Sequence, residues 1–184
     1  MLQKALHAID EANAADPTLE NGKPAALLYG QRMSSELERL YPDAPDALKI
    51  AARGQHIERW ILPRNTYPEG RAGYHAWRRD LARHHADRVA RIMSEAGYES
   101  GAIEAAERML RKEGIKRHED VQALENVICF VFLRFYFSAF ADKHPEEKVL
   151  GIVQKTAKKM SDDGRSRVLN EFELPEHLAA AFKS

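Results

Sequence analysis

Two histidines and one glutamate stand on helix faces that are otherwise apolar. His85 falls on the core-facing stripe of its segment, and Glu125 interrupts a similar stripe near the start of the most apolar segment. His56 lies among small apolar residues from which a central position is expected. Imidazole nitrogen and carboxylate oxygen suit zinc, iron, manganese or nickel, and facing helices commonly build such sites. We therefore predict His56, His85 and Glu125 as ligands of a divalent transition metal.

The same three side chains also fit a purely structural role. His56 and His85 would then be core histidines with satisfied hydrogen bonds, and Glu125 would pair with an arginine such as Arg134. A buried carboxylate must either take up a proton or find a cation. No local HxxxH, HExxH or CxxC spacing separates the two interpretations, so both stay open.

A second set of residues combines arginines with aromatic side chains between residues 57 and 83. Its members are Arg59, Arg64, Arg71, Arg78, Arg79 and Arg83, interleaved with Trp60, Tyr67, Tyr74 and Trp77. Guanidinium groups bind phosphate or carboxylate through two parallel bonds and stack on aromatic rings. This pattern predicts a pocket for a small anionic ligand. The alternative is a loop held on the surface by cation–π and Arg–carboxylate contacts.

Composition narrows the function classes. The chain has 184 residues with 28 Lys and Arg against 28 Asp and Glu, which argues against general nucleic-acid binding. A single Cys129 excludes a disulfide framework and a thiolate zinc site. The apolar run from Val127 to Ala141 contains Arg134 and is too short to cross a membrane, so we expect a buried core helix. We expect no membrane partner and a cytoplasmic location.

The elements that must position these residues are helices. Apolar residues recur at helical spacing almost throughout, so we expect one all-α domain over residues 1–184 and no sheet. Helices are predicted over residues 3–14, 24–40, 46–61, 75–96, 100–112, 119–141 and 145–160, with a short one after Pro175. Residues 62–74 form the one long irregular connection. Lys155, Lys158 and Lys159 mark a solvated face near a helix C-terminus.

Several segments together resemble a known family. They are RMSSEL at residues 32–37, the long block GQHIERWILPRNTYPEGRAGYHAWRRDLARHHA at residues 54–86, QALENVICFVFLRFYF at residues 122–137 and QKTAKKMS at residues 154–161. They look like the domain-of-unknown-function family numbered 4202, whose name assigns no activity. That family has Leu-Glu-Asp where this chain has Leu124-Glu125-Asn126, and more often an aromatic residue at Ala157. The first difference leaves Glu125 as the only acid there.

A looser resemblance links residues 28–33 and 51–57 to the HD-domain phosphohydrolases, which are all-helical metal enzymes. This resemblance implies an HD-like orthogonal helical bundle. Gln31 would replace the first His ligand, and Gln55 and His56 would occupy the places of the consecutive His-Asp pair. His85 would come from the following helix, and Glu125 would lie near the final Asp. Three of the four ligand positions are altered, so the site is either rebuilt or no longer catalytic.

The leading functional hypothesis is a metal-dependent hydrolase acting on a small phosphorylated or carboxylated metabolite. The metal would lower the pKa of its bound water toward about 7. Glu125, Gln55 and Arg59 are the candidate catalytic residues, and His56, His85 and Glu125 the metal ligands. The candidate ligand-binding residues are Gln31, Arg32, Arg59, Trp60, Arg64, Tyr67, Arg71, Tyr74, Trp77 and Arg78. The alternatives are a non-catalytic module that binds a nucleotide or other anion, and a structural subunit of a larger assembly.

Overall fold

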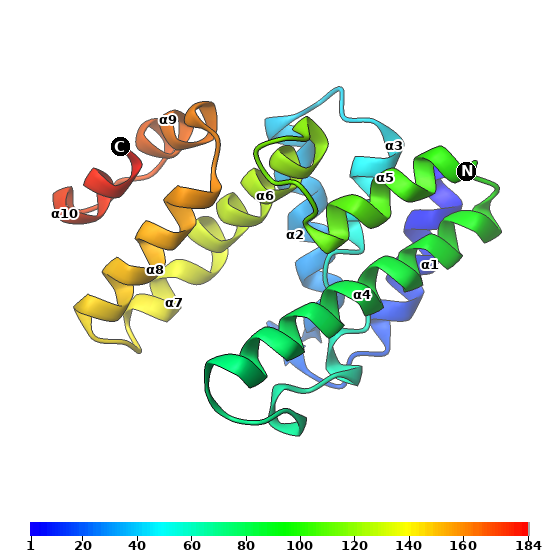
Figure 1. Ribbon diagram of the computed structural model, residues 1–184, viewed down its shortest axis with the longest axis horizontal. Coiled ribbons are helices and arrows are strands. Elements are labelled where there is room, and N and C mark those ends of the chain that lie inside the picture. The colour runs from blue at the N-terminus through cyan, green and yellow to red at the C-terminus, as the bar shows by residue number, and fades with distance from the viewer. Residues whose placement is uncertain (184) are drawn as a thin grey trace. The chain divides into compact units, whose positions relative to one another are not determined.

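The computed structural model describes residues 1–183 and confirms an all-α fold (Figure 1). The chain divides into two compact units, Met1–Glu113 and the segment from Gly114 onward, where the sequence suggested a single domain. The two units are therefore described one at a time.

The first unit contains the long block of the predicted site. Its elements are α1 (Leu2–Ala14), β1 (Leu19–Glu20), β2 (Lys23–Pro24), α2 (Ala25–Leu40), α3 (Asp46–Arg53), η1 (Arg59–Ile61), η2 (Arg64–Thr66), α4 (Gly70–Ala96) and α5 (Ser100–Arg111). Helix α4 packs along α5 and α1, and α3 packs between α2 and α5. The core where these helices meet includes Ile9, Met33, Ile50, Leu81 and Met93.

Helices α1, α2 and α3 are joined by one polar cluster at their crossing. Arg53 donates two hydrogen bonds to the Asp10 carboxylate, both at 2.6 Å, and a third to the Ser34 hydroxyl at 3.1 Å. At Gly30 a Cβ atom would lie only 2.8 Å from the Arg53 carbonyl oxygen, so α2 and α3 approach more closely than a side chain would permit. These contacts fix the position at which α3 ends.

Two predicted helix boundaries and one predicted loop in the first unit are wrong. The helix expected to reach Ile61 ends at Arg53, because Gly54 opens a series of turns and Glu58 takes a left-handed conformation, φ 50°. Helix α4 begins at Gly70 and not at His75, so the irregular segment is shorter. A small hairpin that pairs Leu19 with Pro24 replaces the expected loop, since Asn-Gly favours the tight turn between two strands.

The second unit is built around one long helical segment. It comprises α6 (Glu119–Val131), a π-helical turn (Phe132–Tyr136) and α7 (Phe137–Ala141), followed by α8 (Glu146–Lys159), α9 (Asp162–Glu171), α10 (Glu176–Ala179) and η4 (Ala180–Phe182). By length and composition, residues 119–141 could cross a membrane, but half of their most apolar window is buried in the structure. The helix is therefore longer than the apolar run suggested, and its burial is partial.

Helix α9 and its connection to α6 were not predicted. Ser161 caps α9, and its hydroxyl accepts a hydrogen bond from the Gly164 amide at 3.1 Å. Asn126 holds this cap in place: its Oδ1 accepts from the Ser161 amide at 3.1 Å, and its Nδ2 donates to the Ser161 hydroxyl at 2.9 Å. The family-like segments at residues 122–137 and 154–161, which contain Asn126 and Ser161, therefore have a structural role within the second unit.

Candidate functional site

The site begins at the strained turn that follows α3. Glu58 has a left-handed backbone, which is uncommon for residues other than glycine, asparagine and aspartate. The buried Asn13 accepts a hydrogen bond from the Glu58 amide at 3.0 Å, and Arg88 of α4 donates to the Glu58 carboxylate at 3.0 Å. Strained backbone persists where its surroundings enforce it, and such positions cluster at functional sites. Here the turn directs the next residue, Arg59, between His56 and α4.

Arg59 is held from two sides. Its Nη1 donates to Nε2 of His56 at 3.1 Å, and its guanidinium carbon lies 4.9 Å from the centre of the Trp77 ring. Trp77 is in turn anchored by its indole N–H, which donates to the Leu62 carbonyl oxygen at 2.8 Å. The guanidinium is thus preorganised, and most of its five N–H donors are left for a ligand.

His56 lies between two other rings. It stacks on Tyr29 of α2 with ring centroids 3.8 Å apart and planes 17° apart, and its centroid is 6.0 Å from that of His85. An arginine can only donate, so Nε2 of His56 must accept and its proton resides on Nδ1. The lone pair that a metal would require at Nε2 is therefore already used by Arg59.

Positive charge accumulates around the two histidines. Burial lowers the pKa of His56 well below its usual range, and the neighbouring Arg59, His85, Arg78 and Lys112 lower it further. Burial followed by the charge of Arg78 also lowers the pKa of Arg59. Among residues 1–183, no carboxylate forms an ion pair with Arg59 or Arg78. The lowered pKa values leave both histidines neutral at physiological pH, and no described carboxylate pairs with either guanidinium group.

Within residues 1–183, several buried polar atoms near this cluster lack hydrogen-bond partners, among them one each in His85 and Gln55. His85 is only 4% exposed and its Nε2 is unsatisfied, and Gln55, 6% exposed, has an unsatisfied Oε1. Burial followed by the nearby His84 lowers the pKa of His85 well below its usual range. Unsatisfied buried polar groups are rare and often mark functional positions.

Several predicted ligand-binding residues instead stabilise the segment between α3 and α4. Arg64 donates to the carbonyl oxygens of Tyr67 and Pro68 at 3.1 and 3.0 Å, and the Tyr67 hydroxyl donates to Asp80 at 3.0 Å. Arg71 donates to His75 at 3.3 Å on the exposed surface. These side chains fit the second interpretation of the segment, a loop held by its own arginines.

The remaining predicted ligand-binding residues have mixed surroundings. Arg32 forms an ion pair with Glu20, and Gln31 and Trp60 are half-buried. Tyr74 is 46% exposed, and its ring centroid lies 5.8 Å from that of Trp77. Of these, Tyr74 lies beside the Arg59–Trp77 pair.

The predicted metal set is divided between the two units. Glu125 belongs to the second unit, where it is buried and its Oε1 lies 3.6 Å from Nζ of Lys159. Arg134 pairs with Glu171 at 3.2 Å. Throughout the described part of the chain, no three His, Cys, Asp or Glu side chains are arranged to hold a metal ion.

Sequence reasoning missed four contributors to the site: Asn13, Tyr29, Glu58 and Lys112. Tyr29 was detectable, since it lies two residues before Gln31, which had been singled out. The other three, Asn13, Glu58 and Lys112, act through tertiary contacts or backbone conformation. Helical periodicity in the sequence predicts neither of these.

Comparison with known proteins places the chain in a family. A family model described as a domain of unknown function, DUF4202, matches residues 3–181. No curated protein and no solved structure matches the chain.

Proposed function

Because the chain belongs to the DUF4202 family, whose name assigns no activity, we propose a function from the geometry of the first unit. It binds a small phosphorylated or carboxylated metabolite at a site formed by Arg59, Arg78 and His56. This is the binding function that the sequence offered as the alternative to hydrolysis. The observation that carries it is the pair of partly buried guanidinium groups without a carboxylate partner.

Without a ligand, the neighbouring guanidinium groups of Arg59 and Arg78 have an unfavourable electrostatic free energy. Desolvating a cation and placing it near a second cation are both costly, and proteins ordinarily place an acid beside such groups. An anion bound between Arg59 and Arg78 would remove that cost and gain charge-assisted hydrogen bonds.

The aromatic surroundings indicate the rest of the ligand. Trp77 already covers one face of Arg59, while Tyr29 covers His56 and Tyr74 is partly exposed beside Trp77. Planar groups such as a nucleobase or another aromatic ring stack on such side chains, each contributing about 1–3 kcal/mol. We therefore favour a ligand that joins an anionic group to a planar one.

Calorimetric titration with sulfate, phosphate and a nucleoside monophosphate tests this proposal. Arg59→Gln should weaken phosphate binding by about tenfold or more. A tenfold loss of affinity corresponds to about 1.4 kcal/mol, and a charge-assisted hydrogen bond contributes more than that. Arg59→Lys should restore only part of the affinity, because lysine keeps the charge but loses the planar fork.

Arg83→Gln is the matched control for that experiment. Arg83 is an exposed arginine of the same helix as Arg78, and no described residue forms an ion pair with it. The variant should bind phosphate within about twofold of the parent protein. Equal loss in Arg59→Gln and Arg83→Gln would mean that binding reflects general surface charge, and the proposed site would be abandoned.

Metal-dependent hydrolysis at an HD-like site is a second candidate. It is favoured by one observation: His56 and His85 are neutral imidazoles with rings 6.0 Å apart, and Nε2 of His85 lacks a partner. Ligation by His56 would require Arg59 to release its Nε2. Elemental analysis of protein purified without added metal decides this candidate. Less than about a tenth of an equivalent of zinc, iron, manganese or nickel, with no thermal stabilisation on adding them, would contradict it.

A further inference from the structure

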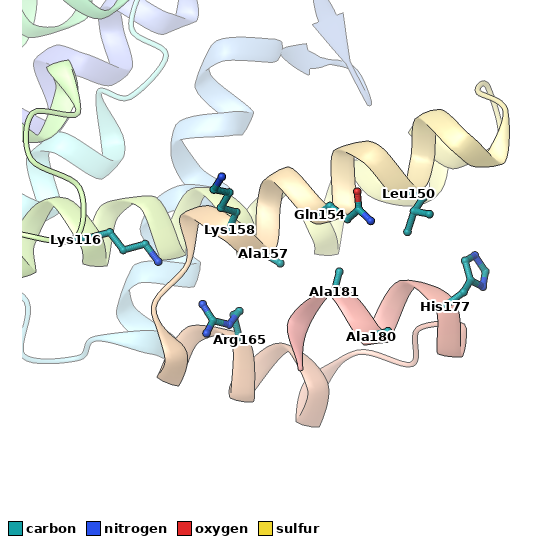
Figure 2. A pocket seen from close by; sticks show the side chains of 9 residues that line it. All are labelled: Lys116, Leu150, Gln154, Ala157, Lys158, Arg165, His177, Ala180 and Ala181. Carbon is teal, nitrogen blue, oxygen red and sulfur yellow. The ribbon is translucent and has the colours of Figure 1, made fainter. Parts of the chain in front are cut away.

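A groove in the second unit has no role in the proposed function. It is bordered by α8, α9 and the turns α10 and η4, and its volume is about 620 Å³ (Figure 2). Small-molecule sites usually measure about 300–1,000 Å³. The groove is therefore large enough for a metabolite of moderate size.

One end of this groove is cationic. Lys116 precedes α6, Lys158 lies in the last turn of α8 and Arg165 in α9, and Figure 2 shows the three around the same end. Neither aspartate nor glutamate lines the groove within residues 1–183. Three separate segments thus bring positive charge to one place.

Contacts within the unit offset only part of that charge. Lys116 Nζ and Arg165 Nη1 donate to the Met160 carbonyl oxygen at 2.8 and 3.3 Å, and Arg165 Nη2 donates to the exposed Asp162 at 2.9 Å. No ion pair to Lys158 exists among the described residues. The C-terminal end of a helix dipole is equivalent to roughly half a negative charge, which is too little to balance the remaining cations.

The backbone at Lys116 is also unusual. Its φ of 74° lies in the left-handed region, two residues after Gly114 with the same φ. A long side chain seldom adopts this conformation, and where it does, the surroundings enforce it, often at a binding site. The conformation carries the Lys116 ammonium to the end of α8, beside Arg165.

The rest of the groove is lined mainly by small and apolar side chains, together with Gln154 and His177. Ala157, Ala180 and Ala181 line its middle, and Leu150 lies at the end opposite the cations (Figure 2). Small side chains leave room for an apolar group between α8 and the C-terminal turns. The groove is thus divided into a cationic end and a body lined mainly by small and apolar side chains.

We propose that this groove binds a small amphipathic organic phosphate. The phosphate lies among Lys116, Lys158 and Arg165, and the apolar portion of the ligand lies against the alanines. A dianionic phosphate with three accepting oxygens matches three cations from three directions better than a carboxylate does. This proposal rests on the second unit alone and does not depend on the site at Arg59.

The test is a titration of the full-length ¹⁵N-labelled protein with hexyl phosphate, followed by amide chemical shifts. Shift changes are expected at residues 157–165 and 180–181. Inorganic phosphate and hexanol each supply half of the ligand, so each should bind at least about tenfold more weakly than hexyl phosphate. Equal affinities for hexyl phosphate and inorganic phosphate would overturn the proposal, as would equal affinities for hexyl phosphate and hexanoate.

Two variants of α8 provide the matched comparison. Lys158→Gln should weaken hexyl phosphate binding about fivefold or more, whereas Lys155→Gln, exposed on the same helix but outside the groove, should leave it unchanged. Equal effects of the two would overturn the proposal. Arg59→Gln separates the two sites, because it should abolish the shift changes around His56 while those at residues 157–165 persist.

Discussion

At the scale of single residues, the hydrogen bond between Arg59 and His56 explains the most about the site. It sets the tautomer of His56. Burial, together with the positive charge of Arg59, keeps that imidazole neutral. A neutral histidine beside two cations can take up a proton more easily when an anion binds nearby. The interaction therefore links ligand binding to protonation at His56.

The first prediction concerns anion binding and pH. A bound anion offsets the charges of Arg59 and Arg78, so it should raise the pKa of His56 from its lowered value. The complex then binds a proton more readily than the free protein, and by linkage affinity should rise as pH falls. Sulfate keeps its charge in this range and is the suitable probe. A sulfate affinity that does not change with pH between about 5 and 7 would contradict this coupling. His56→Gln is the control, because it lacks the imidazole that takes up the proton.

The second prediction concerns stability and pH. The pKa values of His56 and His85 are lowered in the folded protein, whereas unfolded histidine titrates near about 6.5. Below that pH the unfolded chain binds more protons, so the free energy of unfolding should fall as the solution becomes more acidic. The loss approaches about 1.4 kcal/mol per pH unit for each histidine. Urea denaturation at pH 7.5, 6.0 and 5.0 measures it, and His56→Gln should reduce the slope.

At the scale of the elements, Asn126 connects α6 to the junction of α8 and α9. We predict that Asn126→Ala destabilises the protein by about 1–3 kcal/mol, because the Ser161 amide loses its acceptor and the Ser161 hydroxyl loses one of its two partners. Asn126→Asp should cost much less. A carboxylate accepts from the Ser161 amide, and the hydroxyl can rotate to donate to it. Thermal unfolding of the two variants checks the difference, and equal losses would show that the side-chain oxygen is not the important group.

The loop before α4 gives a second test at this scale. A Cβ atom on Gly73 would lie 1.8 Å from the Pro68 carbonyl oxygen, which also accepts from Arg64. Gly73→Ala should therefore shift the loop and cost about 1–3 kcal/mol or more. Gly101→Ala in α5 is the control, since nothing lies within 4 Å of its added Cβ, and it should be neutral or slightly stabilising. Similar unfolding midpoints for the two variants would contradict this packing argument.

The helices could be predicted from the sequence wherever apolar periodicity and clear end signals coincide. Gly97, for example, ends α4 in the predicted left-handed conformation, φ 93°. The turn at Glu58 could not be predicted, because its conformation is imposed by Asn13 and Arg88 from other helices. His85 was correctly placed in the core from its spacing, and the sequence also singled out His56 and Arg59. Their mutual contact depends on that turn.

At the scale of the whole molecule, acidic and basic residues balance within each unit as well as over the chain. The cations at Arg59 and Arg78, and those of the groove, are therefore local concentrations in neutral surroundings. A polyanion such as DNA gains affinity from many phosphate contacts along an extended basic surface. Neither unit has the net charge that usually accompanies such a surface.

We therefore predict that the protein binds small anions but not nucleic acid. It should pass through a heparin column at about 0.15 M salt, where exposed charges are screened beyond roughly 8 Å, while sulfate still protects it against thermal unfolding. Arg59→Gln should remove part of that protection without changing the heparin result. Retention on heparin to high salt, reduced equally by Arg83→Gln and Arg59→Gln, would instead indicate a broad basic surface and contradict the division into two local anion sites.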